Sequence, residues 1–174
     1  MKYSFILTLL LSLFSSNLIA KEWAFDVILN DGIIGKHTFK QLDKESHSLA
    51  KFKFKFMLMS FSYQHDSKET WNGNCLESIE SKTNDDGDLF NVIGAKIDGK
   101  VKVSSNGEDK NLPECIMTFA YWNPAILDQK KLMNSQDAEW LDVAITNVGI
   151  EIKSIQDNEI STHHYTIQAN KDGD

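Results

Sequence analysis

Residues 49–65 read LAKFKFKFMLMSFSYQH, and their hydrophobic pattern decides the predicted fold. Phenylalanines alternate with lysines over residues 51–56, which is the two-residue period of a strand with one apolar face. Over residues 57–63 the apolar side chains move to the opposite parity. Either a β-bulge near residues 57–60 returns the same face to the interior, or one strand is solvated first on one side and then on the other. Both interpretations predict a strongly curved sheet.

Period-two alternation bounded by turn residues recurs along most of the chain. Asp31-Gly32 predicts a hairpin, Asp98-Gly99 and Asn106-Gly107 predict further turns, and Gly35 predicts a bulge or a close approach of another group. The predicted strands are residues 22–29, 33–42, 49–65, 75–83, 90–97, 100–104, 115–121, 139–147, 149–155 and 162–169. This pattern predicts an all-β, mainly antiparallel fold, either a strongly curved sheet or a half-open β-barrel of about 9–10 strands.

Residues 112–124, LPECIMTFAYWNP, predict a strand that leads directly into a helix. The Asn123 side chain can cap the first turn, and the fixed φ of Pro124 suits the first helical position. Lys130 and Lys131 fall in the last turn of the predicted helix, residues 124–133, where they complement the helix dipole. This is the one short helix that the sequence predicts.

The N-terminus has the order of a secretory signal peptide. Lys2 precedes an apolar run over residues 5–14, and Ala20 precedes the charged mature start, so we expect cleavage after Ala20. The run is shorter than the roughly 20 apolar residues of a membrane span, and a buried N-terminal helix is the alternative interpretation. The sequence therefore predicts a signal peptide over residues 1–20, one β domain over residues 21–170 and a disordered tail over residues 171–174. The mature chain is predicted to be periplasmic or secreted, without a transmembrane segment.

The charge and the missing motifs exclude several function classes. The net charge of −7 argues against nucleic acid, and against anionic lipid headgroups, as the main partner. The chain contains no Gly-x-Ser-x-Gly elbow, no phosphate-binding glycine loop and no dinucleotide fingerprint. No cofactor is therefore predicted.

The only two cysteines, Cys75 and Cys115, are expected to form a disulfide, because an exported chain meets an oxidising compartment. The alternative is a catalytic thiol, which would need a nearby base and would leave the second cysteine unexplained.

His37, His65 and Glu69 are the candidate catalytic residues, as general acids or bases. On one extended strand His65 and Glu69 would lie roughly 13 Å apart, at about 3.3 Å per residue, too far to share a metal ion. Only a helical turn or loop between them, with His37 as a third ligand, would build a metal site, and we do not predict one. The alternative is that His65 and Glu69 hydrogen-bond to each other or to backbone.

An apolar ligand site is the other candidate. Its predicted lining is aromatic and methionine side chains, which adapt to irregular apolar shapes but equally form ordinary cores. The predicted ligand-binding residues are Met57, Met59, Phe61, Trp71, Tyr121 and Trp122. The hypotheses, in order, are binding of a small apolar ligand or lipid, an interaction or structural role in the envelope with an unknown protein partner, and an enzyme using His65 and Glu69.

Four motifs carry a family resemblance. They are Trp23-x-Phe25-x-Val27, Asp31-Gly32-x-x-Gly35-x-His37, Tyr63-x-His65-x-x-x-Glu69-x-Trp71-x-x-x-Cys75-Leu76 and Cys115-Ile-Met-Thr-Phe-Ala-Tyr-Trp-Asn-Pro124. Together they resemble an uncharacterised family of exported bacterial proteins, a domain of unknown function. The resemblance implies export and domain boundaries but no activity. The opening hairpin is also similar to periplasmic folds in which a curved antiparallel sheet wraps an apolar cavity, as in lipoprotein carriers.

Overall fold

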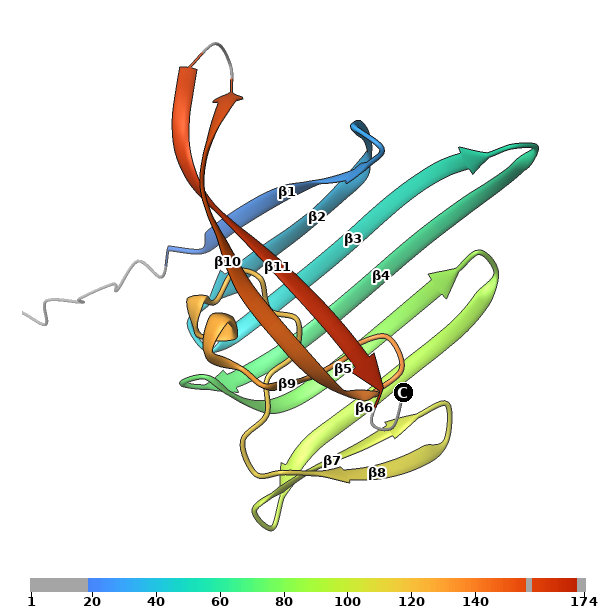
Figure 1. The fold of residues 1–174 in the computed structure, drawn as a ribbon. Coiled ribbons are helices and arrows are strands. Elements are labelled where there is room, and N and C mark those ends of the chain that lie inside the picture. The colour runs from blue at the N-terminus through green and yellow to red at the C-terminus, as the bar shows by residue number, and fades with distance from the viewer. Residues whose placement is uncertain (1–18, 156–157, 172–174) are drawn as a thin grey trace, which may run out of the picture.

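The computed structural model describes residues 19–155 and 158–171, and most of these residues lie in antiparallel strands. Eight strands form a meander in which each strand pairs with the next along the chain (Figure 1). They are β1 (Lys21–Leu29), β2 (Gly32–Leu42), β3 (Glu45–Phe56), β4 (Met59–Asn72), β5 (Cys75–Asp85), β6 (Asp88–Ile97), β7 (Lys100–Ser105) and β8 (Glu108–Leu112). The predicted all-β, antiparallel class is confirmed. Because β1 and β8 are the two edges of this sheet, it is not a closed barrel.

A second, three-stranded sheet lies across one face of the first. Its strands are β9 (Lys131–Met133), β10 (Trp140–Ile155) and β11 (Asn158–Lys171), in the spatial order β11-β10-β9. Figure 1 shows the β10–β11 hairpin crossing the large sheet diagonally. The two strands predicted over residues 139–155 are one strand, in which a register shift between Asn147 and Gly149 replaces the predicted break.

The stretch over residues 49–65 is two strands, not the single strand that its pattern predicted. β3 and β4 form a hairpin in which Phe56 pairs with Met59, so Met57 and Leu58 make the turn, and Met57 has a φ of 54°. Directly paired residues project from the same face of a sheet, so the change of parity in the sequence keeps the phenylalanines on one face. Both interpretations of a single strand, the bulge and the strand solvated on alternate sides, are therefore wrong. The prediction failed because the turn contains neither glycine nor asparagine.

The helix predicted over residues 124–133 is mostly wrong. Asn123 caps a short 3₁₀-helix, η1 (Pro124–Asp128), by accepting a hydrogen bond of 3.0 Å from the Ala125 amide, so the predicted start is confirmed. The chain then enters β9, and Lys131 lies on a strand instead of in a last helical turn. Residues 115–121 do not form a strand either, apart from one bridge between Thr118 and Met133.

The backbone of β3 approaches Gly35 closely, as the position of this glycine predicted. Gly35 pairs with Phe52 next to a register shift between β1 and β2, and a Cβ atom there would lie 2.2 Å from the Lys51 carbonyl oxygen. Asp98-Gly99 and Asn106-Gly107 form the expected turns. The second half of β4 and all of β8 were among the strand segments that the sequence did not predict, because their sequences are mostly polar.

The hydrophobic core lies between the β4–β8 half of the large sheet and the chain that follows β8. Leu76 and Val92 from the sheet meet Met117 and Leu132 from the covering segment, and all four are fully buried. The Cys75–Cys115 disulfide, as predicted, links the start of β5 to that segment. The remaining inner face, on β2–β4, is less apolar and carries the candidate site.

Two predictions fall partly on residues outside the described ranges. The predicted signal peptide includes residues 1–18, and the predicted tail includes residues 172–174, whereas Lys171 ends β11. Within the described part of the chain no helix is long and apolar enough to cross a membrane.

Candidate functional site

Polar side chains occupy the inner face of the central strands, where a small β domain normally carries apolar ones. On β4 this face carries His65, Ser67 and Glu69 in succession, and all three are buried. Ser46 and Ser48 on β3 are buried beside them, because Ser46 pairs with Glu69 and Ser48 with Ser67. Buried polar groups are costly unless they find partners, so this concentration marks the face as functional or as a hydrogen-bonded network.

A cavity of about 320 Å³ opens over this face. The large sheet forms one wall, and the loops before and after β9 form the other with one β10 side chain. The lining residues are His37, Phe39, Ser48, Ala50, Phe52, Tyr63, His65, Glu69, Thr118, Phe119, Tyr121, Asn134, Ser135 and Leu141. The cavity therefore combines aromatic and hydrogen-bonding groups from segments far apart in the sequence.

Both histidines of the cavity contact hydroxyl groups. The Nε2 atom of His37 lies 2.7 Å from the Ser48 hydroxyl. His65 contacts the Thr83 hydroxyl through Nδ1 at 2.7 Å and the Ser135 hydroxyl through Nε2 at 3.0 Å. Burial lowers the pKa of His37 to about 4, with a smaller contribution from the nearby His65, and burial also lowers the pKa of His65. At neutral pH both rings are therefore uncharged.

Glu69 is the acidic group of the cavity. Its two carboxyl oxygens accept hydrogen bonds of 3.4 Å from the hydroxyls of Ser46 and Ser67. Burial raises the pKa of Glu69 to about 7. Hydrogen bonds from hydroxyl groups oppose that rise, and the largest of these contributions comes from Thr118. The carboxyl group therefore changes between its neutral and ionised forms near neutral pH.

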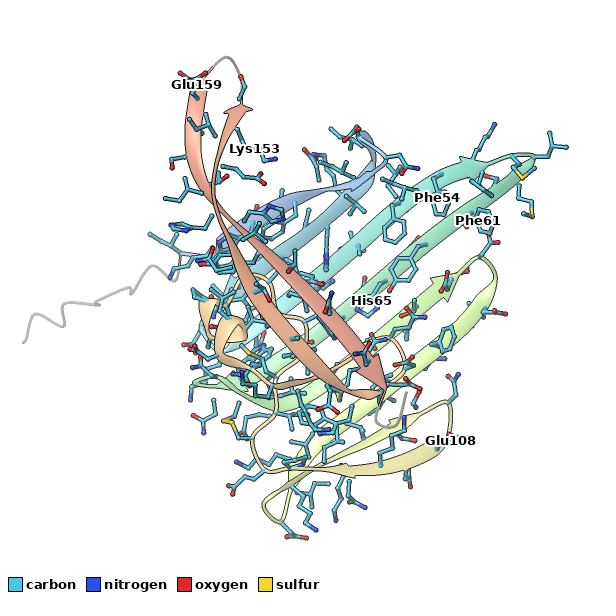
Figure 2. All side chains as sticks on the ribbon, viewed as in Figure 1. Phe54, Phe61, His65, Glu108, Lys153 and Glu159 are labelled. Carbon is cyan, nitrogen blue, oxygen red and sulfur yellow. A yellow bond between two sulfur atoms is a disulfide. The ribbon has the colours of Figure 1, made fainter. Side chains whose placement is uncertain are left out.

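A ladder of stacked aromatic rings leads from the outer end of the β3–β4 hairpin into the cavity. Phe54 stacks on Phe61 at a centroid distance of 5.1 Å, and Phe52 stacks on Tyr63 at 4.6 Å. Tyr63 in turn lies 6.4 Å from the His65 ring. Figure 2 shows Phe54 and Phe61 towards the hairpin end and His65 further along β4. The inner face of this hairpin thus changes from apolar to polar along its length.

The structure brings the three predicted catalytic residues into one cavity. His37, His65 and Glu69 all line it, but within the described part of the chain they hydrogen-bond to hydroxyl groups and not to one another. The described residues contain no cluster of three or more histidine, cysteine, aspartate or glutamate side chains arranged to hold a metal ion.

The predicted ligand-binding residues are more scattered. Tyr121 lines the cavity, and Phe61 belongs to the aromatic ladder. Trp71 is buried in the hydrophobic core, and Trp122 packs against it at 5.7 Å. Met57 and Met59 are exposed at the end of the β3–β4 hairpin and do not line the cavity.

Sequence reasoning missed the small polar residues of the cavity. Ser48 continues the parity of Phe52 on β3, so the period of that strand would have identified it as inward-facing. Thr118 and Ser135 lie on irregular segments before and after β9, where no local periodicity marks them. Only the three-dimensional fold brings these two residues to the cavity.

Comparison with protein families gives one result. A family described as a domain of unknown function (DUF6134) matches residues 25–174. The chain belongs to this family. No curated protein and no solved structure matches it. The resemblance to an uncharacterised family is therefore confirmed, without a test of export or of the individual motifs. Membership of DUF6134 assigns no chemistry to the cavity.

Proposed function

We propose that the cavity binds a small amphipathic ligand with an uncharged, hydrogen-bonding end. The observation that carries this proposal is the change along the β3–β4 hairpin, from the Phe54–Phe61 stack to the buried polar group at His65. Ligand sites are typically apolar clefts with a few well-placed polar groups. An apolar portion would lie against the aromatic ladder, and the polar end would lie among His65, Ser135 and Glu69.

The electrostatics of the lining support an uncharged polar end. Among the described residues no lysine lines the cavity, and burial lowers the pKa of both His37 and His65, which keeps both rings neutral near pH 7. A buried carboxylate or phosphate of a ligand would therefore lack a cationic partner and would lose its hydration. Hydroxyl, amide and ester groups can exchange hydrogen bonds with imidazole and hydroxyl groups at no such cost.

The size of the cavity supports a small ligand. Ligand pockets usually span about 300–1,000 Å³. The volume of about 320 Å³ stands at the lower end of that range. A medium-chain monoacylglycerol is a suitable probe, because it joins an uncharged diol to a single acyl chain.

Native mass spectrometry of the protein purified from the cell envelope tests this proposal. Ala50 lines the cavity and is buried, so Ala50→Leu should fill part of the space and release a bound ligand. Ala24→Leu makes the same change on the exposed face of β1 and should keep the ligand. The proposal predicts a non-covalent adduct on the wild-type protein and on Ala24→Leu only. Wild-type protein that stays empty even after addition of the monoacylglycerol would contradict it.

A second candidate function is hydrolysis. The Ser135 hydroxyl lies 3.0 Å from Nε2 of His65, and the other nitrogen of that ring contacts Thr83. This is the geometry of a serine with an adjacent base, although a hydroxyl takes the place of the usual orienting carboxylate. A fluorophosphonate probe should label Ser135 if the serine is nucleophilic. If the probe does not label the protein, or if labelling does not require both Ser135 and His65, ligand binding remains the proposed function.

We infer that the chain acts in an oxidising compartment outside the cytoplasm. The Cys75–Cys115 disulfide supports this inference, because such bonds persist mainly in exported proteins. The intact mass of the protein recovered from the envelope fraction tests it. A mass that retains residues 1–20 would contradict cleavage after Ala20.

A further inference from the structure

The outer end of the β3–β4 hairpin projects beyond the rest of the sheet as a two-stranded arm, defined here as residues 53–61. β2 pairs with β3 only as far as Phe52, and β5 pairs with β4 only from Tyr63 onwards. Within the arm, β3 and β4 pair only with each other, up to the Phe56–Met59 pair. Figure 1 shows this end of the hairpin reaching past the neighbouring strands. The arm is therefore a separate element, free to contact something outside the domain.

The arm has an apolar face and an unusually exposed apolar end. Phe54 and Phe61 form the stacked pair of one face, and Phe56 and Met59 extend that face outwards. The side chains of the turn are almost wholly in solvent, with Met57 82% and Leu58 103% exposed. An exposed turn of a monomeric protein is normally polar, since loops avoid apolar contact with water. These side chains thus predict a partner that covers them.

The opposite face of the arm is cationic. Lys53 and Lys55 are exposed there, and Lys51 continues the row on the same strand. None of the three forms an ion pair within the described residues. The acidic turn at Asp86 reaches only the base of the arm, where its amide donates a hydrogen bond to the Ser62 carbonyl. The arm is therefore locally basic in a chain whose net charge is −7.

We propose that this arm docks onto a lipid bilayer that contains anionic headgroups. Met57, Leu58 and the adjacent Phe56 would enter the acyl region, while Lys53 and Lys55 would meet lipid phosphates. Apolar insertion combined with basic side chains is the usual requirement for reversible surface binding. The negative net charge does not prevent it, because fields act within a Debye length of about 8 Å at physiological salt, and the lysines lie on the projecting element.

The docking surface goes beyond ligand binding and does not depend on it. The two would nevertheless be continuous, because the apolar face of the arm runs into the Phe52–Tyr63 stack at the cavity. An amphipathic molecule leaving the bilayer at the arm would therefore meet aromatic rings along its path. Vesicle binding is measured without any cavity ligand, so failure of docking and failure of the proposed cavity function are distinguishable.

Vesicle co-sedimentation tests the docking surface, using phosphatidylcholine vesicles with and without phosphatidylglycerol. The protein should bind the vesicles that contain phosphatidylglycerol, and added salt should weaken this binding. Lys53→Gln combined with Lys55→Gln should reduce vesicle affinity roughly 25-fold, since each lysine near an anionic surface contributes about fivefold. Leu58→Asp should abolish binding, because it places a charge at the inserted end.

Matched variants control for charge and exposure. Lys44→Gln combined with Lys68→Gln removes two exposed lysines that lie away from the arm, one in the β2–β3 turn and one on β4, and should change binding little. Leu89→Asp is the control for Leu58→Asp. It makes the same substitution at another exposed leucine, beside the β5–β6 turn, and should also leave binding intact. The proposal is overturned if the wild-type protein does not bind these vesicles, or if the control variants lose affinity as strongly as the arm variants. Binding of a protein partner through the arm, without vesicle binding, would also overturn it.

Discussion

The indole nitrogen of Trp71 donates a hydrogen bond of 2.9 Å to the hydroxyl of Ser46. That hydroxyl lies 3.4 Å from a carboxyl oxygen of Glu69, so one small side chain separates the buried indole from the acid of the cavity. The core and the candidate site are therefore coupled through a short hydrogen-bond chain.

Tryptophan fluorescence should report the ionisation of Glu69. Because burial raises the pKa of Glu69 to about 7, its charge appears next to the Trp71–Ser46 pair near neutral pH. We expect an emission change with a midpoint near pH 7. Glu69→Gln should remove that step, whereas Glu108→Gln, an exposed change on β8 labelled in Figure 2, should keep it. A step that survives Glu69→Gln would contradict this coupling.

Glu69→Gln should stabilise the protein above neutral pH. The folded-state pKa of about 7 exceeds the ordinary value of 4.5, so the unfolded chain loses this proton first as pH rises. The contribution of Glu69 to stability therefore falls between pH 4.5 and about 7 and stays low above that range. The shift corresponds to roughly 3 kcal/mol. Urea unfolding at several pH values measures it, and an equal effect of Glu69→Gln at pH 4 and pH 8 would contradict the assignment.

His37 should have the opposite dependence on pH. Its folded-state pKa of about 4 lies below the ordinary 6.5, so the unfolded chain takes up the proton first as pH falls. Its contribution to stability is therefore complete above pH 6.5 and is lost as pH falls towards 4. His37→Gln should flatten this part of the stability curve. NMR titration of the His37 ring gives the direct measurement, and a midpoint near 6.5 would contradict burial of the neutral form.

Gly35→Ala should destabilise the sheet beside the cavity. The added Cβ would lie 2.2 Å from the Lys51 carbonyl oxygen, which would force β2 and β3 apart. Overpacking of this kind costs typically about 1–3 kcal/mol. Gly32→Ala is the control, since its Cβ would approach only the Leu29 carbonyl, at 3.5 Å. Thermal unfolding that ranks the two variants equally would contradict the close approach.

Part of the fold was predictable because short local sequence patterns specify its turns and strands. Asp31-Gly32 and Asn106-Gly107 mark turns through residues that tolerate positive φ, and the alternating runs identify strands with one apolar face. The Met57-Leu58 turn was not predictable in this way. Its side chains match no turn preference, although Met57 adopts a φ of 54° and the two residues connect the Phe56–Met59 pair.

For the candidate site, the sequence indicated some of the residues but not their arrangement in space. His37, His65 and Glu69 were recognisable as chemically capable residues, yet local spacing could not show that β2 and β4 bring them to one cavity. The polar second half of β4 has no apolar alternation, because its inner face carries Ser67 and Glu69 where a core strand carries apolar side chains. Ser135 reaches His65 across 70 positions of sequence, so only the tertiary fold reveals that pair.

The most direct measurement of the central claim is a fluorescence titration of the purified protein with a medium-chain monoacylglycerol. If the cavity binds this ligand, tryptophan emission should change saturably, and the fatty acid of the same chain length should give a weaker response. Ala24→Leu should leave the response unchanged. Ala50→Leu should abolish it, as should Ser135→Leu, which fills the cavity from the opposite wall. A response that never saturates, or one that both cavity-filling variants retain while still folded, would contradict ligand binding at this site.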